Sequence, residues 1–213
     1  MIYDINIANQ VAKSLLQINA IILQPNAPFK WAAGWNSPIY CDNRKVLSYP
    51  KIRSYIKKGL ADVIRNHYNS TDVIAGVATA GIPHGALVAE ELGLPFIYVR
   101  AKAKEHGKQN QIEGYFKEGQ SVILVEDLIS SGKSSLEAAA TLKEAGMNVK
   151  GIISIFTYNF NTASENFKNE NCEYVSLCDY NTLLPQAIEQ KYIKEEDLSI
   201  LKEWRENPSN WKK

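Results

Sequence analysis

Two adjacent carboxylates, Glu126 and Asp127, follow a short apolar run at residues 122–125 and precede a loop of serines and glycine at residues 130–134. The loop leads into a segment with helical periodicity. Free backbone N–H groups in such a loop, with the positive end of a helix dipole, form an anion site suited to a phosphate. Carboxylates accept hydrogen bonds from a sugar diol and repel phosphate. The segment therefore predicts that the two acids bind ribose hydroxyls while the loop binds the 5′-phosphate.

The nearest competing motif is the triphosphate-binding loop G-x-x-x-x-G-K-[ST], whose end matches Gly132, Lys133 and Ser134. Its first glycine position is occupied here by Asp127, and a carboxylate at that point would face the triphosphate. Each acid taken alone is more often a cap or an ion-pair partner at a strand end. Because both acids stand directly before the loop, we favour the sugar-phosphate interpretation.

A second feature is the connection between residues 100 and 120, which has neither helical nor strand periodicity. Loops of this length within a compact domain are usually functional or disordered. Basic side chains and one histidine gather in its first half: Arg100, Lys102, Lys104, His106 and Lys108. Such a loop beside a phosphate cradle is typical of a lid that closes over an anion and excludes water. A solvated charged loop is the alternative.

The elements needed to position these loops are those of an α/β fold with a mostly parallel sheet flanked by helices. A third loop, the small-residue turn at residues 76–83, leaves the first strand and brings Thr79 and Ala80 to the same sheet edge, either as anion-binding backbone or as a plain tight turn. In such sheets ligands bind outside the carboxyl ends of the strands. Strands are expected at residues 72–77, 95–99, 121–125, 149–158 and 174–177, and helices at residues 8–16, 50–64, 83–92, 134–145 and 198–204.

Composition excludes several classes of protein. The 213 residues carry 24 Lys and Arg against 23 Asp and Glu, a net charge of +1, which argues against a general nucleic-acid binder. The three cysteines have no C-x-x-C spacing and favour buried thiols in a reducing compartment over a disulfide or zinc site. We find no apolar run long enough to span a bilayer and no signal-peptide pattern, so the expected location is cytoplasmic.

Several motifs together resemble one enzyme family. Residues 122–135 resemble the phosphoribosyl-pyrophosphate (PRPP) motif of the type I phosphoribosyltransferases. Residues 37–44, Ser-Pro-Ile-Tyr-Cys-Asp-Asn-Arg, resemble the N-terminal signature of the members that use orotate. Arg100 with residues 104–107 resembles their catalytic lid, and residues 111–114 and 176–180 resemble further segments. The first motif alone is common to the superfamily, and its combination with the N-terminal signature makes the resemblance specific to orotate.

The resemblance implies a single domain over residues 1–213, with a core at about residues 51–180. A small hood, formed by about residues 1–50 and part of the C-terminal tail, would cover the base. It also implies a homodimer with shared active sites and a Mg²⁺-dependent reaction of PRPP with orotate that yields orotidine 5′-phosphate and pyrophosphate for UMP biosynthesis. Lys104, Glu126 and Asp127 would be catalytic. The residues that would bind PRPP are Thr79, Ala80, Arg100, Lys104, His106, Glu126, Asp127, Leu128, Ile129, Ser130, Ser131, Gly132, Lys133 and Ser134, while Ser130 and Tyr40 would contact orotate.

This chain departs from some members of the family at three positions. Ala32 and Ala101 stand where those members have lysines, and Tyr158 stands where they have an arginine for the orotate carboxylate. Other groups, such as backbone N–H donors of the hood, must then bind that carboxylate. Two alternatives remain open at this point: transfer to another base such as a purine, and a regulator that retains the PRPP pocket as a sensor and binds nucleic acid.

Overall fold

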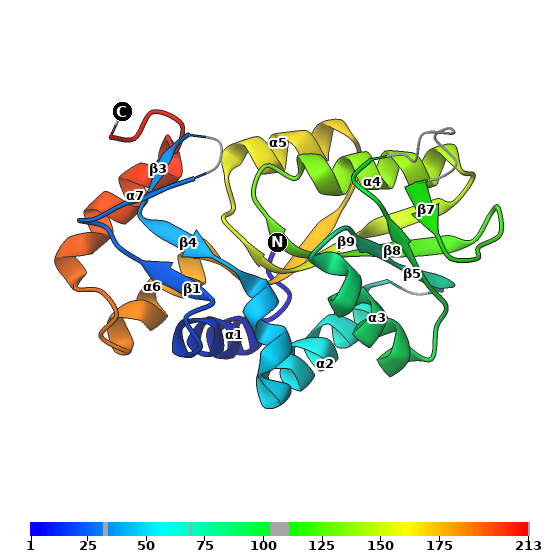
Figure 1. Cartoon of the computed structure of the whole chain (residues 1–213), viewed down its shortest axis with the longest axis horizontal. Coiled ribbons are helices and arrows are strands. Elements are labelled where there is room, and N and C mark those ends of the chain that lie inside the picture. Colours follow the sequence, from blue (N-terminus) through cyan, green and yellow to red (C-terminus); the bar gives the residue numbers. More distant parts are fainter. Residues whose placement is uncertain (32–33, 69, 103–110, 213) are drawn as a thin grey trace.

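The computed structural model describes residues 1–31, 34–68, 70–102 and 111–212. Its centre is a six-stranded sheet of order β10-β9-β8-β5-β6-β7 (Figure 1). All neighbours in this sheet are parallel except the short β7, which runs antiparallel to β6. The α/β prediction is therefore confirmed. The strands are β5 (Val73–Val77), β6 (Phe96–Val99), β7 (Ile112–Glu113), β8 (Ser121–Ile129), β9 (Asn148–Thr157) and β10 (Tyr174–Asp179).

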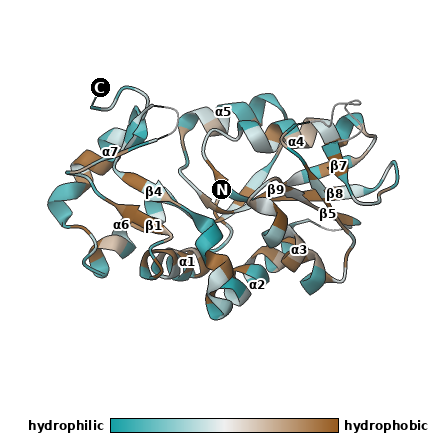
Figure 2. Ribbon diagram, in the orientation of Figure 1, coloured by the Kyte–Doolittle hydropathy of each residue, from teal (hydrophilic) through white to brown (hydrophobic). Residues whose placement is uncertain are grey.

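Helices cover both faces of the sheet, with α4 and α5 on one side and α2 and α3 on the other (Figure 1). Because successive strand residues point to opposite faces, the strands feed two separate cores. Ile74 packs with the α1, α2 and α3 side, whereas Val73 and Ala75 pack with α4 and α5. Figure 2 shows brown, hydrophobic stretches in the sheet between the helices, interrupted where β8 and β9 contain polar residues. These helices are α1 (Ile5–Gln17), α2 (Pro50–His67), α3 (Gly81–Leu92), α4 (Lys133–Glu144) and α5 (Asn161–Asn169).

Local sequence accounts for most of these boundaries. Proline at the first helical position opens α2. Gly93, with φ of 65°, ends α3 in the left-handed conformation that glycine adopts readily. One boundary differs from the expectation: β8 continues to Ile129, so the two acids lie inside the strand rather than after its end. The reason is that β9 continues to pair with β8 as far as Thr157.

The first fifty residues and the C-terminal segment lie together at one end of the sheet (Figure 1). Trp31 packs its ring against Trp204 at 5.6 Å, and the Nζ of Lys212 donates to the carbonyl of Pro25. We call this assembly the hood. Its elements are β1 (Ile21–Leu23) paired with β4 (Ile39–Cys41), β2 (Phe29–Lys30) paired with β3 (Asn36–Ser37), the 3₁₀ helices η1 (Asn43–Ser48) and η3 (Glu195–Asp197), and helices α6 (Tyr180–Glu189) and α7 (Leu198–Glu206).

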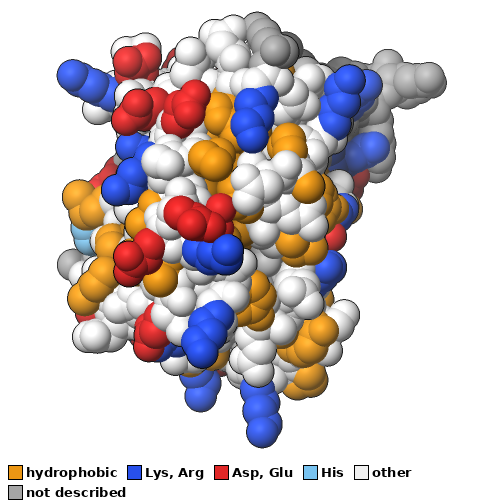
Figure 3. All heavy atoms as spheres, turned by 90° about the vertical axis from the view of Figure 1, so that its left-hand side faces the viewer, with side chains coloured by type: hydrophobic (Ala, Val, Ile, Leu, Met, Phe, Trp, Pro, Cys, Tyr) orange, Lys and Arg blue, Asp and Glu red, His pale blue; other side chains and the backbone are white. Residues whose placement is uncertain are grey.

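The surface charges are mixed, and of the three thiols expected to be buried only Cys178 is, whereas Cys41 and Cys172 are half-buried. Positive and negative side chains are interspersed over the hood end of the molecule, which Figure 3 faces. Cys41, Cys172 and Cys178 are all free thiols. Within the described ranges, no helix combines the length and apolar character needed to cross a bilayer.

Candidate active site

The paired carboxylates lie on β8, just beyond the point where its neighbour β5 stops pairing at Gly76 and Val125. Glu126 is 6% exposed, and its carboxyl group accepts hydrogen bonds from the Asp127 N–H at 3.0 Å and from the Ser135 hydroxyl at 3.1 Å. Burial raises the pKa of Glu126 well above its ordinary value, and the Asp127 charge raises it further. Burial also raises the pKa of Asp127. Desolvated acids of this kind interact strongly with any cation that develops beside them.

The phosphate-cradle loop connects β8 to α4, as expected. Gly132 has φ of 78°, and a Cβ there would lie 2.3 Å from a ring carbon of Phe167 on α5. Asn166 Nδ2 donates to the Ser131 carbonyl at 2.9 Å, so α5 holds the loop from behind. No side chain caps α4 at Gly132. The Lys133 N–H contacts the Ser131 hydroxyl at 3.5 Å, so the next N–H groups, those of Ser134 and Ser135, are the ones suited to an anion site.

The turn after β5 and the base of the lid meet this loop at the same sheet edge. The turn packs closely on β8, since a Cβ on Gly81 would lie 2.3 Å from the Val125 carbonyl oxygen. Arg100 N–H donates to the Gln111 carbonyl at 2.8 Å, which closes the neck of the connection on either side of residues 103–110. A pocket of about 350 Å³ lies beside α4, where Arg100 and Gln111 meet Ser134, Glu137 and Thr141, and its lining does not include Glu126 or Asp127. This volume is within the range of small-molecule sites.

Other predicted residues differ in their placement. Lys104 and His106 fall within residues 103–110, outside the described residues. Ser130 and Leu128 are half-buried and Lys133 is exposed, whereas Ile129 is fully buried. The Ile129 carbonyl accepts from the Tyr158 N–H at 3.1 Å and from the Thr157 hydroxyl at 3.2 Å. A larger pocket of about 1020 Å³ lies between α1 and α2 and contains none of the predicted site residues.

Two tyrosines near the site differ in exposure: Tyr40 belongs to the hood, and Tyr158 directly follows β9. Tyr40 on β4 is 38% exposed, with its ring 5.7 Å from Phe29, as a residue that stacks on a base should be. Tyr158 is 2% exposed and lies among the rings of Trp31, Phe160 and Trp204. The Tyr158 phenol is therefore part of the hydrophobic core beneath the site. It does not provide the exposed positive charge that an arginine at this position would provide.

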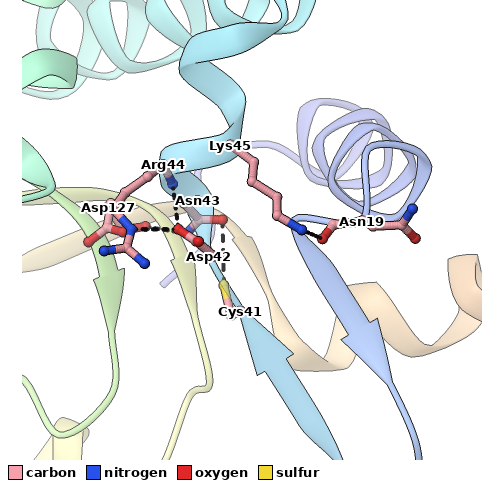
Figure 4. A network of polar contacts seen from close by, with 7 residues as sticks. All are labelled: Asn19, Cys41, Asp42, Asn43, Arg44, Lys45 and Asp127. Atoms are coloured by element: carbon pink, nitrogen blue, oxygen red, sulfur yellow. Dashed lines mark hydrogen bonds and ion pairs between the residues drawn. The ribbon is translucent and has the colours of Figure 1, made fainter.

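Sequence reasoning did not assign roles to Asn43, Arg44 or Ser135, which contact or face the paired acids. Asn43 Nδ2 donates to the Asp127 carbonyl at 2.7 Å, and Arg44 points toward the Asp127 carboxylate while pairing with Asp42 at 2.6 Å (Figure 4). The only available signal was the position of residues 42–44 within the N-terminal signature. Nothing local indicates which distant strand these side chains reach.

Comparison with known proteins gives a consistent result. The family described as phosphoribosyl transferase domain matches residues 44–182. The orotate phosphoribosyltransferase of Cytophaga hutchinsonii is 53% identical over 98% of this chain and 100% of its own length. The crystal structure of orotate phosphoribosyltransferase from Aeropyrum pernix superposes with a TM-score of 0.74 at 27% identity, covering 83% of this chain and 97% of that one.

A longer protein shares the same fold. The Leishmania donovani UMP synthase structure superposes with a TM-score of 0.79 at 27% identity and covers 93% of this chain, which spans 42% of that protein. The paired acids, the uncapped helix and the hood thus occur in a chain whose relatives match it along nearly its whole length. This chain belongs to the phosphoribosyltransferase family, grouped with the members named orotate phosphoribosyltransferase.

Proposed function

We propose that this protein transfers the 5-phosphoribosyl group of PRPP to orotate, producing orotidine 5′-phosphate and pyrophosphate in UMP biosynthesis. The observation that carries the proposal is the 53% identity to an orotate phosphoribosyltransferase over 98% of the chain, because the match includes the hood that covers the base. A match confined to the PRPP loop would support only the superfamily.

Each loop at this edge of the sheet binds a different part of PRPP. Glu126 and Asp127 orient the ribose hydroxyls, and the cradle of residues 130–134 binds the 5′-phosphate. Thr79, Ala80 and Arg100 receive the pyrophosphate, with Lys104 and His106 of the lid completing that contact. Tyr40 and Ser130 contact orotate from the hood side and the loop side respectively.

Charge stabilisation is the main catalytic task. Departure of pyrophosphate leaves positive charge on the anomeric carbon of ribose, and the two desolvated acids favour that charge. The basic groups, with Lys104 foremost, neutralise the leaving pyrophosphate. Orotate reacts as its anion, so no general base is assigned. Closure of the lid excludes water, which would otherwise take the sugar.

Mg²⁺ fits this site as a substrate-borne ion. Among the described residues there is no group of three acids, histidines or cysteines that would form a protein cage. Mg²⁺ usually keeps few protein ligands and is bound largely through substrate phosphates, so no residue of this chain is assigned to it directly and PRPP would bring it to the site. When bound, the ion neutralises the pyrophosphate charge.

The resemblance also supports a cytoplasmic homodimer in which the lid of one subunit completes the site of the other. Mixing Lys104→Ala with Asp127→Asn chains tests the sharing, because one intact site per mixed dimer would restore part of the turnover. Mixed dimers shown to form without any restored turnover would rule the sharing out.

The test of the reaction follows the loss of orotate absorbance on addition of PRPP, with and without Mg²⁺, and with purine bases as parallel substrates. Mg²⁺-dependent loss with orotate alone is the expected result. Reaction with a purine instead would overturn the assignment of the base, and donor binding without any reaction would favour the sensor. Asp127→Asn should lower turnover sharply with little unfolding; unchanged turnover would remove the ribose-binding role from Asp127.

A further inference from the structure

The backbone of Asp127 is held by side chains where a strand neighbour is missing. Pairing between β5 and β8 ends at Gly76 and Val125, two residues before this position. The Asp127 N–H donates to Glu126 Oε1 at 3.0 Å, and the Asp127 carbonyl accepts from Asn43 Nδ2 at 2.7 Å. On the side that β5 no longer covers, the N–H and the carbonyl of Asp127 thus bond to side chains, while Glu126 and Leu128 stay paired with β9 on the other side.

Asn43 is itself fixed at both ends of its amide. The side chain is completely buried, and its Oδ1 accepts from the Cys41 thiol at 3.5 Å (Figure 4). Burial keeps the pKa of the Cys41 thiol well above its ordinary value, so the sulfur retains the proton that it donates. With its oxygen facing Cys41 and its nitrogen facing Asp127, the amide has one defined orientation.

A third element joins the same residue from the core. His84, a residue of the first turn of α3 that is 3% exposed, lies against the backbone of Asn43. Burial lowers the pKa of His84 to about 4, so the imidazole is neutral near physiological pH. Asn43 thus connects β4 of the hood, helix α3 and the ribose-binding part of β8.

We propose that Asn43 is a positioning residue for the transfer reaction, which holds the Asp127 carboxylate in register with the ribose by bonding to the carbonyl of the same residue. The inference rests on the proposed function, in which Asp127 contacts the sugar. Small displacements of a reacting group are costly: about 1 Å can lower the rate on the order of 100-fold. A side chain that fixes the Asp127 backbone is therefore expected to influence kcat.

Two substitutions of similar size separate positioning from bulk packing. Asn43→Leu removes the donor at every pH and should lower kcat by about 10-fold to 100-fold, with a smaller change in the KM for orotate. Asn43→Asp keeps the shape, and its carboxylic acid can donate a hydrogen bond only while protonated. Its kcat relative to the unmodified protein should therefore rise as the pH falls.

The groups that face this position all enter the design of the pH series. Cys41 lies on β4, His84 on α3 and Asp127 on β8, and the ion pair of Asp42 and Arg44 lies beside it. Because these groups are present in every variant, comparing Asn43→Asp with Asn43→Leu and with the unmodified protein at each pH removes their contribution. Lys45→Met is the matched control in the same 3₁₀ helix: it removes only the bond from Lys45 Nζ to the Asn19 carbonyl and should retain full kcat.

Amide hydrogen exchange over residues 122–131 provides a readout that does not require turnover. Asn43→Leu should accelerate exchange there, while Lys45→Met should not. The inference is overturned if Asn43→Leu keeps kcat within about twofold, or if the Asn43→Asp ratio does not change with pH. Should the leucine variant not fold, the aspartate series alone decides. An unmodified protein without orotate turnover would refute the proposed function, and unchanged exchange in Asn43→Leu would then refute the positioning role separately.

Discussion

Trp204 is expected to be the residue on which the hood most depends for stability. It is fully buried in α7, and four aromatic rings surround it at centroid distances of 5.4 to 5.7 Å: Trp31, Tyr158, Phe160 and Tyr180. Truncation of a buried tryptophan to alanine typically lowers the free energy of unfolding by about 3–5 kcal/mol. Trp204→Ala should fall in that range because the ring contacts join three separate segments of the chain.

Phenylalanine at the same position should cost much less. The indole N–H of Trp204 is buried and has no hydrogen-bond partner among the described residues. An unpaired buried donor costs about 1–3 kcal/mol, and Trp204→Phe removes it while keeping a ring in the cluster. We therefore expect the phenylalanine variant to lose less than about half of what alanine loses.

Urea unfolding followed by far-ultraviolet circular dichroism measures both variants without relying on tryptophan fluorescence. Trp35→Ala is the control, since Trp35 is 37% exposed and should change stability by less than about 1 kcal/mol. Equal losses for Trp204→Phe and Trp204→Ala would refute the reasoning, because they would show that the shape of the indole, and not ring packing, carries the stability.

Three further predictions concern single sites. The folded pKa of Glu126 is raised, so its contribution to stability is complete below the ordinary value and is lost as the pH rises through the raised one. Glu126→Gln should therefore be more stable than the unmodified protein at about pH 8 but not at about pH 4, and its turnover should be lower. A stability difference in urea unfolding that does not change with pH would contradict this. The folded pKa of His84 is lowered from 6.5 to about 4. The stability that neutral His84 contributes is therefore complete above pH 6.5 and falls by about 3 kcal/mol as the pH falls through the folded pKa. His84→Gln should flatten that decline when urea unfolding is measured across the same pH range. Gly132→Ala should destabilise the protein by more than about 2 kcal/mol because the new Cβ would clash with Phe167. Gly119→Ala is the control: Gly119 also has a positive φ, but no atom lies near its Cβ position, so the cost should be about 1 kcal/mol. Equal melting temperatures of the two variants would exclude the clash.

Much of the central fold follows from local pattern. Residues 73–77 are a continuous apolar run and residues 149–158 are mostly apolar, which is the pattern of a strand buried on both faces. Gly93 and Gly146 correctly mark the ends of two helices. Helices α5 and α6 were not predicted because their sequence patterns are weak. Helix α5 buries only Ala163 and Phe167, and α6 contains a proline at position 185.

The site divides in the same way. The acids and the loop before α4 are contiguous, so their adjacency could be predicted from spacing alone. The contact between Asn43 and Asp127 spans 84 residues, and no periodicity encodes a contact of that kind. The burial of Tyr158 likewise depends on Trp31 and Trp204, which come from opposite ends of the chain.

The joining of both chain ends in one hood has a consequence for synthesis. Trp31 leaves the ribosome long before Trp204, so the hood cannot close until α7 has been synthesised. The sheet, whose strands lie between these two segments, can form earlier, since nascent chains fold from the N-terminal side as residues emerge. A nascent chain stalled shortly before α7 would hold an ordered sheet with an exposed aromatic surface, and shortening the C-terminus should therefore impair acceptance of the base before it impairs binding of the sugar phosphate.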